Sequence, residues 1–296
     1  MNQDSKGPLA VTQLSHTKVF TDPHFRLRVM RVPKHSPGGL HSHAFHELVV
    51  ILDGRAEHQV DRMRYKLEGG DTFVILGDTA HRYTESTGLY LVNILFDPDH
   101  LGIPRADIES LPGYHALFTV EPRMRRRGNF KNRLRLDADQ LAHAAELIAA
   151  IEEEIDDRNH GYRYLAIAHL MQLIGYLSRC YSQLDRDEAR PINQLSEVLG
   201  YMERHYAEPL TVADLTQVAG MSQTSLMRKF KEILGCPPVT HLIRLRIAKA
   251  RRLLRHTSMT IGEVAFDVGF QDSNYFSRQF RQVTGVSPRR YRERQG

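Results

Sequence analysis

The chain has 296 residues, of which 41% are hydrophobic and 25% charged, a composition typical of a folded globular protein long enough for two domains. No run approaches the roughly 18 apolar residues of a membrane helix, and the polar opening from Met1 to Ala10 lacks the apolar core of a secretory signal, so we expect a cytoplasmic protein with no membrane partner. The two cysteines, Cys180 and Cys236, exclude a disulfide framework and a thiolate zinc site, and the formal net charge of +5 is informative only once it is divided along the chain.

Short β-strand patterns follow one another from Phe25 to Phe96. They are HFRLRVMRV, ELVVILD, DTFVIL and LYLVNILF, each rich in β-branched or aromatic residues. Gly, Pro and Asp residues lie between them, as is typical of turns. This spacing predicts that the N-terminal domain is a small barrel or sandwich.

Two polar motifs lie within this predicted barrel. His41, His43 and Glu47 have the spacing HxHxxxE, and Gly54 follows after six further residues. The second motif is GDTFVILGDTAH, which ends at His81. The two motifs resemble the two halves of the cupin fingerprint. This resemblance implies that His41, His43, Glu47 and His81 bind a divalent transition metal through imidazole nitrogen and carboxylate oxygen.

The second motif departs from the cupin pattern at two positions. Leu76 stands where a proline is usual, and Glu85 stands where an asparagine often closes the motif. An alternative therefore remains open, because sensor cupins resemble this signature while binding an organic effector without a metal. In that case the three histidines and Glu47 are hydrogen-bonding groups of an effector pocket, and they suit a hydroxyl-rich ligand such as a sugar.

Other polar residues of this region receive a structural interpretation. His46 and His58 are expected at the surface or at the edge of the core. The run MRRR, from Met124 to Arg127, lies in a stretch without periodicity and is expected to be a solvated loop rather than a second DNA contact.

Two helical patterns follow the strands, with apolar residues at three-to-four spacing in each. The first comprises Leu141, Ala145, Ile148, Ile151 and Ile155, and the second comprises Ile167, Leu170, Ile174, Leu177 and Tyr181. A barrel followed by a helix pair is therefore predicted. The pair either closes the barrel or pairs with its copy in a second subunit, and we favour the second option, which makes the protein a homodimer.

The last third of the chain repeats itself, and each copy predicts a helix, a turn and a second helix. Val212, Leu215, Ala219 and Gly220 recur as Ile261, Val264, Val268 and Gly269, and Leu226, Phe230, Ile233 and Gly235 recur as Phe276, Phe280, Val283 and Gly285. In each copy the apolar residues form one face of a helix pair, and the first glycine provides the turn. Ser222 and Asp272 are expected to cap the second helices. Residues 240–255 predict a long basic helix between the copies.

The run from Ile192 to Arg292 resembles the DNA-binding domain of the AraC/XylS family of transcription regulators. The resemblance is carried by LTVADLTQVAGMSQTSLMRKFKEILG and, over nearly the whole family signature, by IGEVAFDVGFQDSNYFSRQFRQVTGVSPRRYR. It implies two recognition helices, residues 223–233 and 273–283, that enter successive major grooves. The charge agrees with this, because residues 190–296 carry 17 Lys and Arg against 9 Asp and Glu, whereas residues 1–189 carry 23 against 26.

Helix geometry selects the side chains that we expect to meet DNA. Positions opposite the apolar face, near the start of each recognition helix, reach base edges. They are Thr224, Met227 and Arg228 in the first copy and Ser273, Asn274, Ser277 and Arg278 in the second. Because arginine pairs bidentately with guanine, Arg228 and Arg278 are the strongest candidates for base readout. The residues expected to bind phosphates, or to be merely solvent-exposed, are Lys229, Arg246, Arg251, Arg281 and Arg289.

Together these patterns predict an α+β protein of two domains. Residues 1–183 form a cupin-like effector-binding and dimerisation domain with a barrel and a helix pair, residues 184–190 a linker, and residues 191–296 an all-α DNA-binding domain. We interpret the chain as a transcription regulator rather than an enzyme, in which an effector changes how the barrel holds the DNA-binding domain. An activator would also contact RNA polymerase. The alternative function is a metal-dependent cupin enzyme with an appended DNA-binding module.

Overall fold

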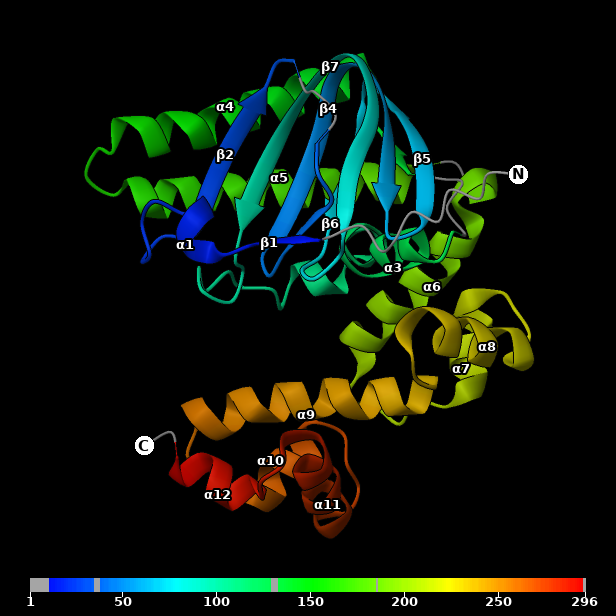
Figure 1. Cartoon of the computed structure of the whole chain (residues 1–296). Coiled ribbons are helices and arrows are strands. Elements are labelled where there is room, and N and C mark those ends of the chain that lie inside the picture. Colours follow the sequence, from blue (N-terminus) through cyan, green and yellow to red (C-terminus); the bar gives the residue numbers. More distant parts are fainter. Residues whose placement is uncertain (1–10, 35–37, 129–132, 185, 295–296) are drawn as a thin grey trace, which may run out of the picture. The chain divides into compact units, whose positions relative to one another are not determined.

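The computed structural model describes residues 11–34, 38–128, 133–184 and 186–294, and the chain divides into two compact units, residues 1–193 and 194–296 (Figure 1). The polar opening from Met1 to Ala10 lies outside the described residues. Among the described residues, no helix is long and apolar enough to cross a membrane. The described strands all belong to the first unit, and the described part of the second unit is helical, which confirms the predicted α+β two-domain class.

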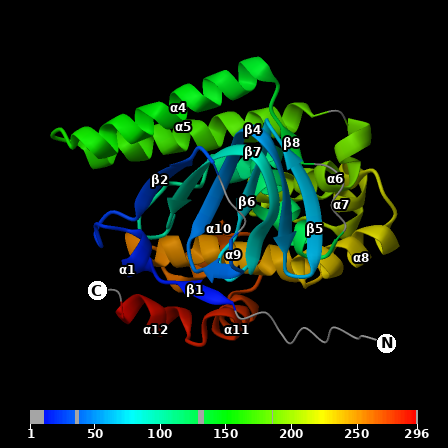
Figure 2. The ribbon, with the colours of Figure 1, turned by 45° about the horizontal axis from the view of Figure 1, so that its top comes forward.

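The first unit is built on one eight-stranded sheet (Figure 2). Its strands are β1 (Thr12–Leu14), β2 (Leu27–Val32), β3 (His41–His43), β4 (His46–Val60), β5 (Met63–Glu68), β6 (Asp71–Ile75), β7 (His81–Phe96) and β8 (Leu134–Arg135). The long strands β4 and β7 pair antiparallel, β5 and β6 pair with β4, and β2 and β3 pair with β7. The short strands complete the sheet, with β1 parallel to β3 and β8 antiparallel to β6.

The sheet curls into the predicted barrel because β4 and β7 bend. The β4–β7 register shifts around Asp53, as at a β-bulge. Gly54 lies at this bend with φ of +82°, and a Cβ there would lie 2.3 Å from the carbonyl oxygen of Gly88, so only glycine fits. Both halves of β4 contribute to an apolar interior that comprises Val49, Ile51, Ala56, Leu67, Phe73, Ile75, Tyr83, Leu89 and Leu91.

The predicted helix pair follows the sheet. Helices α4 (Ala138–Asp157) and α5 (Tyr162–Gln183) pack against each other, and α4 also packs on β2 (Figure 1). Arg31 of β2 forms an ion pair of 2.6 Å with Glu152 of α4. The pair therefore covers the sheet of its own chain with apolar residues that include Ile148, Ile151, Leu170, Ile174, Leu177 and Tyr181.

Short helices complete the first unit. They are α1 (His16–Val19), η1 (Ile108–Ser110), α2 (Pro112–His115), the π-helical turn η2 (Ala116–Val120) and α3 (Glu121–Arg126). Helix α2 packs closely on α5, because a Cβ on Gly113 would lie 1.9 Å from the carbonyl oxygen of Ser178. The prediction of a solvated loop at Met124 to Arg127 is wrong. Met124 and Arg125 are buried in α3, which packs beside β6.

Helix α6 (Arg186–His205) begins within the predicted linker. Residues 186–190 are helical, and Pro191 lies inside the helix. The run DEAR consists largely of good helix formers, which explains why the segment continues a helix rather than forming an extended connection. The division of the chain into two compact units falls between Asn193 and Gln194.

The second unit contains the two predicted helix-turn-helix motifs, with α7 and α8 in the first and α10 and α11 in the second. Its helices after α6 are α7 (Val212–Ala219), α8 (Gln223–Leu234), α9 (Pro238–His256), α10 (Ile261–Asp267), α11 (Ser273–Thr284) and α12 (Pro288–Glu293). The side chains of Ser222 and Asp272 cap α8 and α11, as predicted. The long basic helix between the copies is α9.

The apolar residues of the second copy form their own core. Phe276 and Phe280 are fully buried against Ile247 and other residues of α9. Val283 was expected to extend this apolar face, and that prediction is wrong because its side chain is 44% exposed. Tyr291 of α12 occupies the adjoining position instead, with its ring centroid 5.4 Å from that of Phe280.

Candidate functional site

The four side chains of the cupin-like motifs meet inside the barrel. His41 and His43 lie on β3, Glu47 near the start of β4, and His81 at the start of β7. Nε2 of His43 lies 2.8 Å from Oε2 of Glu47, and Nε2 of His81 lies 3.3 Å from the same oxygen. The ring centroids of His41 and His81 are 4.2 Å apart. His41 is partly buried, and the other three side chains are buried.

The three imidazoles of this cluster are held in one tautomeric arrangement by the backbone. Each Nδ1 donates to a carbonyl oxygen, that of Gly39 for His41 (3.1 Å), Phe45 for His43 (2.9 Å) and Thr79 for His81 (3.0 Å). Since a carbonyl only accepts, each Nδ1 carries the proton, and Nε2 is left to face the cluster. Metal-binding histidines are oriented in the same way.

The negative charge of Glu47 requires positive charge elsewhere in this cluster. Burial alone would raise the pKa of Glu47, but its hydrogen bonds with His43 and His81 outweigh burial and hold this pKa well below its usual range. Burial and the neighbouring His81 lower the pKa of His41. A carboxylate that faces two Nε2 atoms needs positive charge between them, supplied either by added protons on the imidazoles or by a bound metal ion.

Three of the four predicted metal ligands have ligand atoms that all lie close to one another. Among the described residues, His41, Glu47 and His81 each bring one ligand atom within 4.8 Å of the others. His43 lies outside this set and holds the Glu47 carboxylate by its 2.8 Å contact. Two imidazoles and one carboxylate are a donor set suited to a divalent transition metal. The residues present therefore fit the metal that the cupin resemblance implies.

The expectation for His58 is wrong, because this side chain is fully buried in the barrel rather than at the surface or the core edge. Its ring lies 5.7 Å from that of His81 and 4.7 Å from that of Tyr83. The β4–β7 register shifts around Asp53, so the inward side of β4 changes between Ile51 and Ala56, and His58, two residues beyond Ala56, faces the interior. His46, by contrast, is partly buried and stacks on Phe96, as expected for the core edge.

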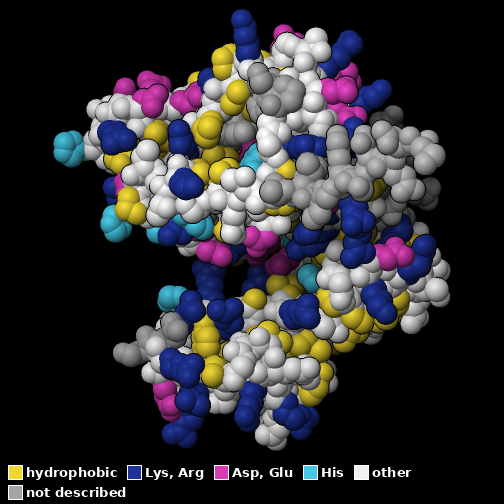
Figure 3. Space-filling view, viewed as in Figure 1, with side chains coloured by type: hydrophobic (Ala, Val, Ile, Leu, Met, Phe, Trp, Pro, Cys, Tyr) yellow, Lys and Arg dark blue, Asp and Glu magenta, His cyan; other side chains and the backbone are white. Residues whose placement is uncertain are grey.

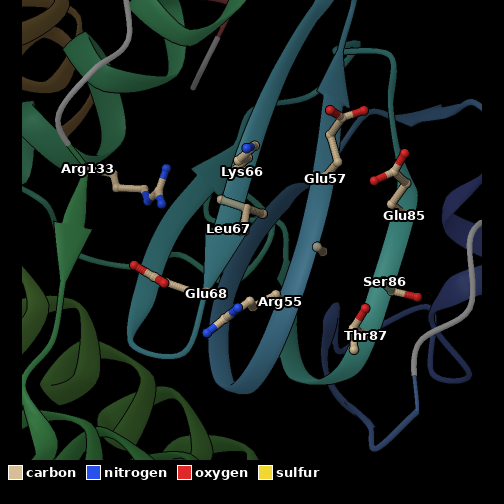
Figure 4. Close-up of a pocket in the computed structure, with 10 residues that line it drawn as sticks. Arg55, Glu57, Lys66, Leu67, Glu68, Glu85, Ser86, Thr87 and Arg133 are labelled. Carbon is tan, nitrogen blue, oxygen red and sulfur yellow. The ribbon is translucent and has the colours of Figure 1, made fainter.

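A concave region is lined by residues of strands β4, β5 and β7 and by Arg133 (Figure 4). It has a volume of about 430 Å³ and is lined by charged side chains that include Arg55, Glu57, Lys66, Glu68 and Glu85. Ala56 and Leu67 also line it, and both belong to the apolar interior. None of the four members of the histidine cluster is among the residues that line this region.

The predicted DNA-contacting side chains lie on α8 and α11, and most are exposed. Thr224, Met227, Arg228, Asn274 and Arg278 are exposed, whereas Ser273 and Ser277 are partly exposed. Arg228 lies within 3.8 Å of Glu232, an ion pair in which both side chains remain largely solvent-exposed. The guanidinium of Arg278 lies 5.8 Å from the ring centre of Tyr275. Figure 3 shows many Lys and Arg side chains over this unit.

Several of the arginines expected at phosphates have partners within the second unit. Arg246 donates to the carbonyl oxygens of Tyr206 and Glu208 at 2.7 Å each, which ties α9 to the end of α6. Arg251 donates to the hydroxyl of Tyr291 at 3.1 Å. These contacts give Arg246 and Arg251 a structural role that the spacing of the sequence did not reveal.

Comparison with known proteins places the two units in one family. Residues 23–174 match the family described as AraC-like ligand binding domain, and residues 215–294 match the family described as helix-turn-helix domain. The chain is 31% identical over 258 residues to the HTH-type transcriptional activator RhaS of Escherichia fergusonii, which covers 86% of this chain and 87% of that protein. The chain belongs to the AraC family of transcription regulators.

Other relatives are similar to most or to part of this AraC-family regulator. RhaS of Enterobacter sp. strain 638 is 30% identical over 258 residues, which is 86% of this chain and 87% of that protein. A solved AraC-type regulator from Chromobacterium violaceum is 32% identical and covers 36% of this chain and 96% of its own, with a TM-score of 0.35. The DNA-binding domain of AdpA, solved with a target DNA, is 33% identical and covers 34% of this chain and 91% of its own, with a TM-score of 0.33.

The family assignment defines the role of each unit. The chain is a DNA-binding transcription regulator with a ligand-binding N-terminal domain and a C-terminal helix-turn-helix domain. The histidine cluster lies within the ligand-binding domain, and α8 and α11 are the second helices of the two helix-turn-helix motifs.

Proposed function

We propose that this regulator controls transcription in response to a small molecule bound inside its barrel, and that a sugar is the class of effector. The observation that carries the proposal is the backbone-oriented cluster of His41, His43, Glu47 and His81, of which all but His41 are buried, in the same chain as two exposed recognition helices. Imidazole and carboxylate groups suit hydroxyl-rich ligands. A regulator of this kind binds DNA in the cytoplasm and is not an enzyme.

The DNA contacts in this proposal come from α8 and α11. Arg228 and Arg278 pair with guanine bases in the major groove, supported by Asn274. The other contacting side chains are Thr224, Met227, Ser273 and Ser277. Support comes from the exposure of both arginines near the first turns of helices whose opposite faces are buried.

The proposal also includes a metal at the histidine cluster. His41, Glu47 and His81 would hold it, and His43 would keep the Glu47 carboxylate in place. A divalent ion held there would supply a Lewis acid that polarises an oxygen atom of the effector. The protein's own contribution is to orient the three imidazoles through the backbone carbonyls and to exclude water by burial.

Assembly and activation complete the proposal. The relatives named above are called transcriptional activators, and we propose that this chain also activates, as a homodimer that contacts RNA polymerase. Tyr164, Leu165 and Met171 are exposed apolar side chains on α5, which agrees with pairing through this helix.

The test is to select bound fragments of genomic DNA with the full chain and to measure the affinity for the recovered site with and without candidate sugars. Because an effector shifts affinity only through its different affinity for two states, at least one sugar should change operator binding severalfold. Operator binding that no sugar changes would contradict control by this class of effector. A metal-dependent enzyme is the second candidate, favoured by the three-ligand set, and turnover of a small substrate by the Co²⁺-loaded chain would establish it.

A further inference from the structure

A second group of polar side chains lies inside the ligand-binding unit, beyond the metal-type cluster. His58 of β4 is fully buried, with its ring 4.7 Å from that of Tyr83 and 5.3 Å from that of Phe73. Neither ring nitrogen has a hydrogen-bond partner among the described residues. A buried polar group without a partner is costly, so a fold retains one where something else has to bind it.

Helix α3 brings an ion pair to the same place. The guanidinium of Arg125 lies 3.9 Å from the centre of the Phe73 ring, and its Nε donates to Oε1 of Glu121 at 2.8 Å. The hydroxyl of Tyr65 donates to the carbonyl oxygen of Arg125, which fixes α3 against the barrel. Oε2 of Glu121 is buried and has no hydrogen-bond partner among the described residues.

The group continues from the barrel to helix α5. Tyr181 of α5 is fully buried, and its hydroxyl has no hydrogen-bond partner among the described residues. Burial raises the pKa of Tyr181, and the charge of Glu121 acts in the same direction while that of Arg125 opposes it, so the three groups lie close enough to interact. From α5 the chain continues through Leu184 into α6.

We propose that His58, the Glu121–Arg125 pair and Tyr181 form the part of the effector site that recognises the organic ligand, and that this ligand is uncharged and rich in hydroxyl groups. This inference rests on the proposed control by an effector in the barrel. It assigns recognition to residues outside the cupin-like motifs, on β4, α3 and α5.

The charge and hydrogen-bonding capacity of these groups select the ligand. The charges of Glu121 and Arg125 balance each other, and His58 is fully buried beside the rings of Phe73 and Tyr83. A charged ligand group beside His58, Glu121 and Arg125 would therefore find no counter-charge among these three side chains, which is costly. A hydroxyl group both donates and accepts, so it matches the carboxylate oxygen, the phenol and both nitrogens of a neutral imidazole. Because Tyr181 belongs to α5, a ligand bound here contacts the helix that leads to the DNA-binding unit.

The experiment uses two conservative variants of the full chain. His58→Phe keeps the stacking on Phe73 and Tyr83 but removes both ring nitrogens, and Tyr181→Phe removes one hydroxyl. The matched control is His46→Phe, since His46 stacks on Phe96 on the other side of β4. Thermal unfolding of each protein is followed with D-glucose, D-xylose, D-galactose and L-arabinose as uncharged probes and D-glucuronate as a charged probe. Binding to the folded state raises the unfolding midpoint.

We expect at least one uncharged sugar to raise the midpoint of the wild type and of His46→Phe. The affinity for this sugar should fall about tenfold or more in His58→Phe and severalfold in Tyr181→Phe, through lost hydrogen bonds. His58→Gln, which keeps a donor and an acceptor, should recover part of the loss. Without sugar, His58→Phe should unfold at or above the wild-type midpoint, because it removes an unpartnered polar group.

Three results would overturn the inference: no uncharged sugar raises the wild-type midpoint, glucuronate alone does so, or both phenylalanine variants respond as the wild type does. If His58→Phe does not fold, the response of Tyr181→Phe to the sugar tests the inference by itself. Operator binding by the wild type is measured in parallel. Intact operator binding without a sugar response counts against this inference alone, whereas loss of operator binding counts against the proposed regulator.

Discussion

Oε2 of Glu47 lies 3.3 Å from Nε2 of His81, although the strand register pairs Glu47 with Leu95 and pairs His81 with Val60. The contact exists because β4 and β7 bend and the sheet closes on itself, so that residues paired at distant points of one ladder face each other across the barrel. Formation of the cluster therefore depends on closure of the barrel.

Removal of one imidazole from this cluster tests metal binding directly. His81→Ala should lower the affinity of the chain for Co²⁺ by at least about tenfold, because it removes a ligand that the backbone has already oriented. Titration calorimetry or the visible spectrum of bound Co²⁺ measures this. His46→Phe is the control and should bind as the wild type does. Equal Co²⁺ binding by His81→Ala would rule out this cluster as the metal site.

Arg278 should read a base rather than a phosphate. Arg278→Ala is expected to weaken binding to the selected operator by about 1 to 3 kcal/mol and to relax the preference at one base position. Arg289→Ala is the control variant. The Arg289 side chain is 87% exposed and ion-paired with Glu293. If the affinity of Arg278→Ala falls equally for all DNA sequences, Arg278 contacts a phosphate instead of a base.

The close contact between α2 and α5 predicts opposite effects for two glycines. Gly113→Ala should lower the free energy of unfolding by about 1 to 3 kcal/mol, because its Cβ would meet the carbonyl oxygen of Ser178. Gly175→Ala, in the interior of α5 with no atom within 4 Å of the new Cβ, should raise it by about 0.5 to 1 kcal/mol. Denaturant unfolding of the two variants measures both, and equal effects would contradict the close packing.

The capping box of α10 predicts a pH-dependent contribution to stability. Thr260→Ala should lower the free energy of unfolding by about 1 kcal/mol at neutral pH. Hydrogen bonds from the backbone and side chain of Thr260 lower the pKa of Glu263, so the stabilisation is present above the ordinary carboxyl pKa and is lost as pH falls through the lowered value. The difference between wild type and variant should therefore shrink in acid. A difference that stays constant would show that the Thr260 side chain does not act through Glu263, whose hydrogen bond with the Thr260 N–H is kept in the variant.

Local patterns predicted most of the fold because they follow directly from helix and strand periodicity. The caps Ser222 and Asp272 and the long helix α9 lie where the sequence indicates them. The four cupin-motif residues also come together, because strand alternation keeps His41, His43 and Glu47 inside.

The errors arise where tertiary contacts override local pattern. Arg125 is buried although it lies in a run of arginines, because Glu121 neutralises it and Phe73 packs against its guanidinium. His58 is buried because the register shift around Asp53 changes which residues of β4 face the interior. Val283 is exposed because Tyr291 supplies the last core position. The charge and the spacing of residues along the chain do not predict these tertiary contacts.

The most direct test of the account is a selection of random DNA by the full chain and by the Arg228→Ala and Arg278→Ala variants. The account predicts that the wild type selects two short motifs about one helical turn, roughly 10 base pairs, apart. Each variant should lose its preference at a base in a different motif. A wild type that selects no motif, or variants that both keep the full wild-type preference, would contradict the assignment of α8 and α11 as the helices that read the operator.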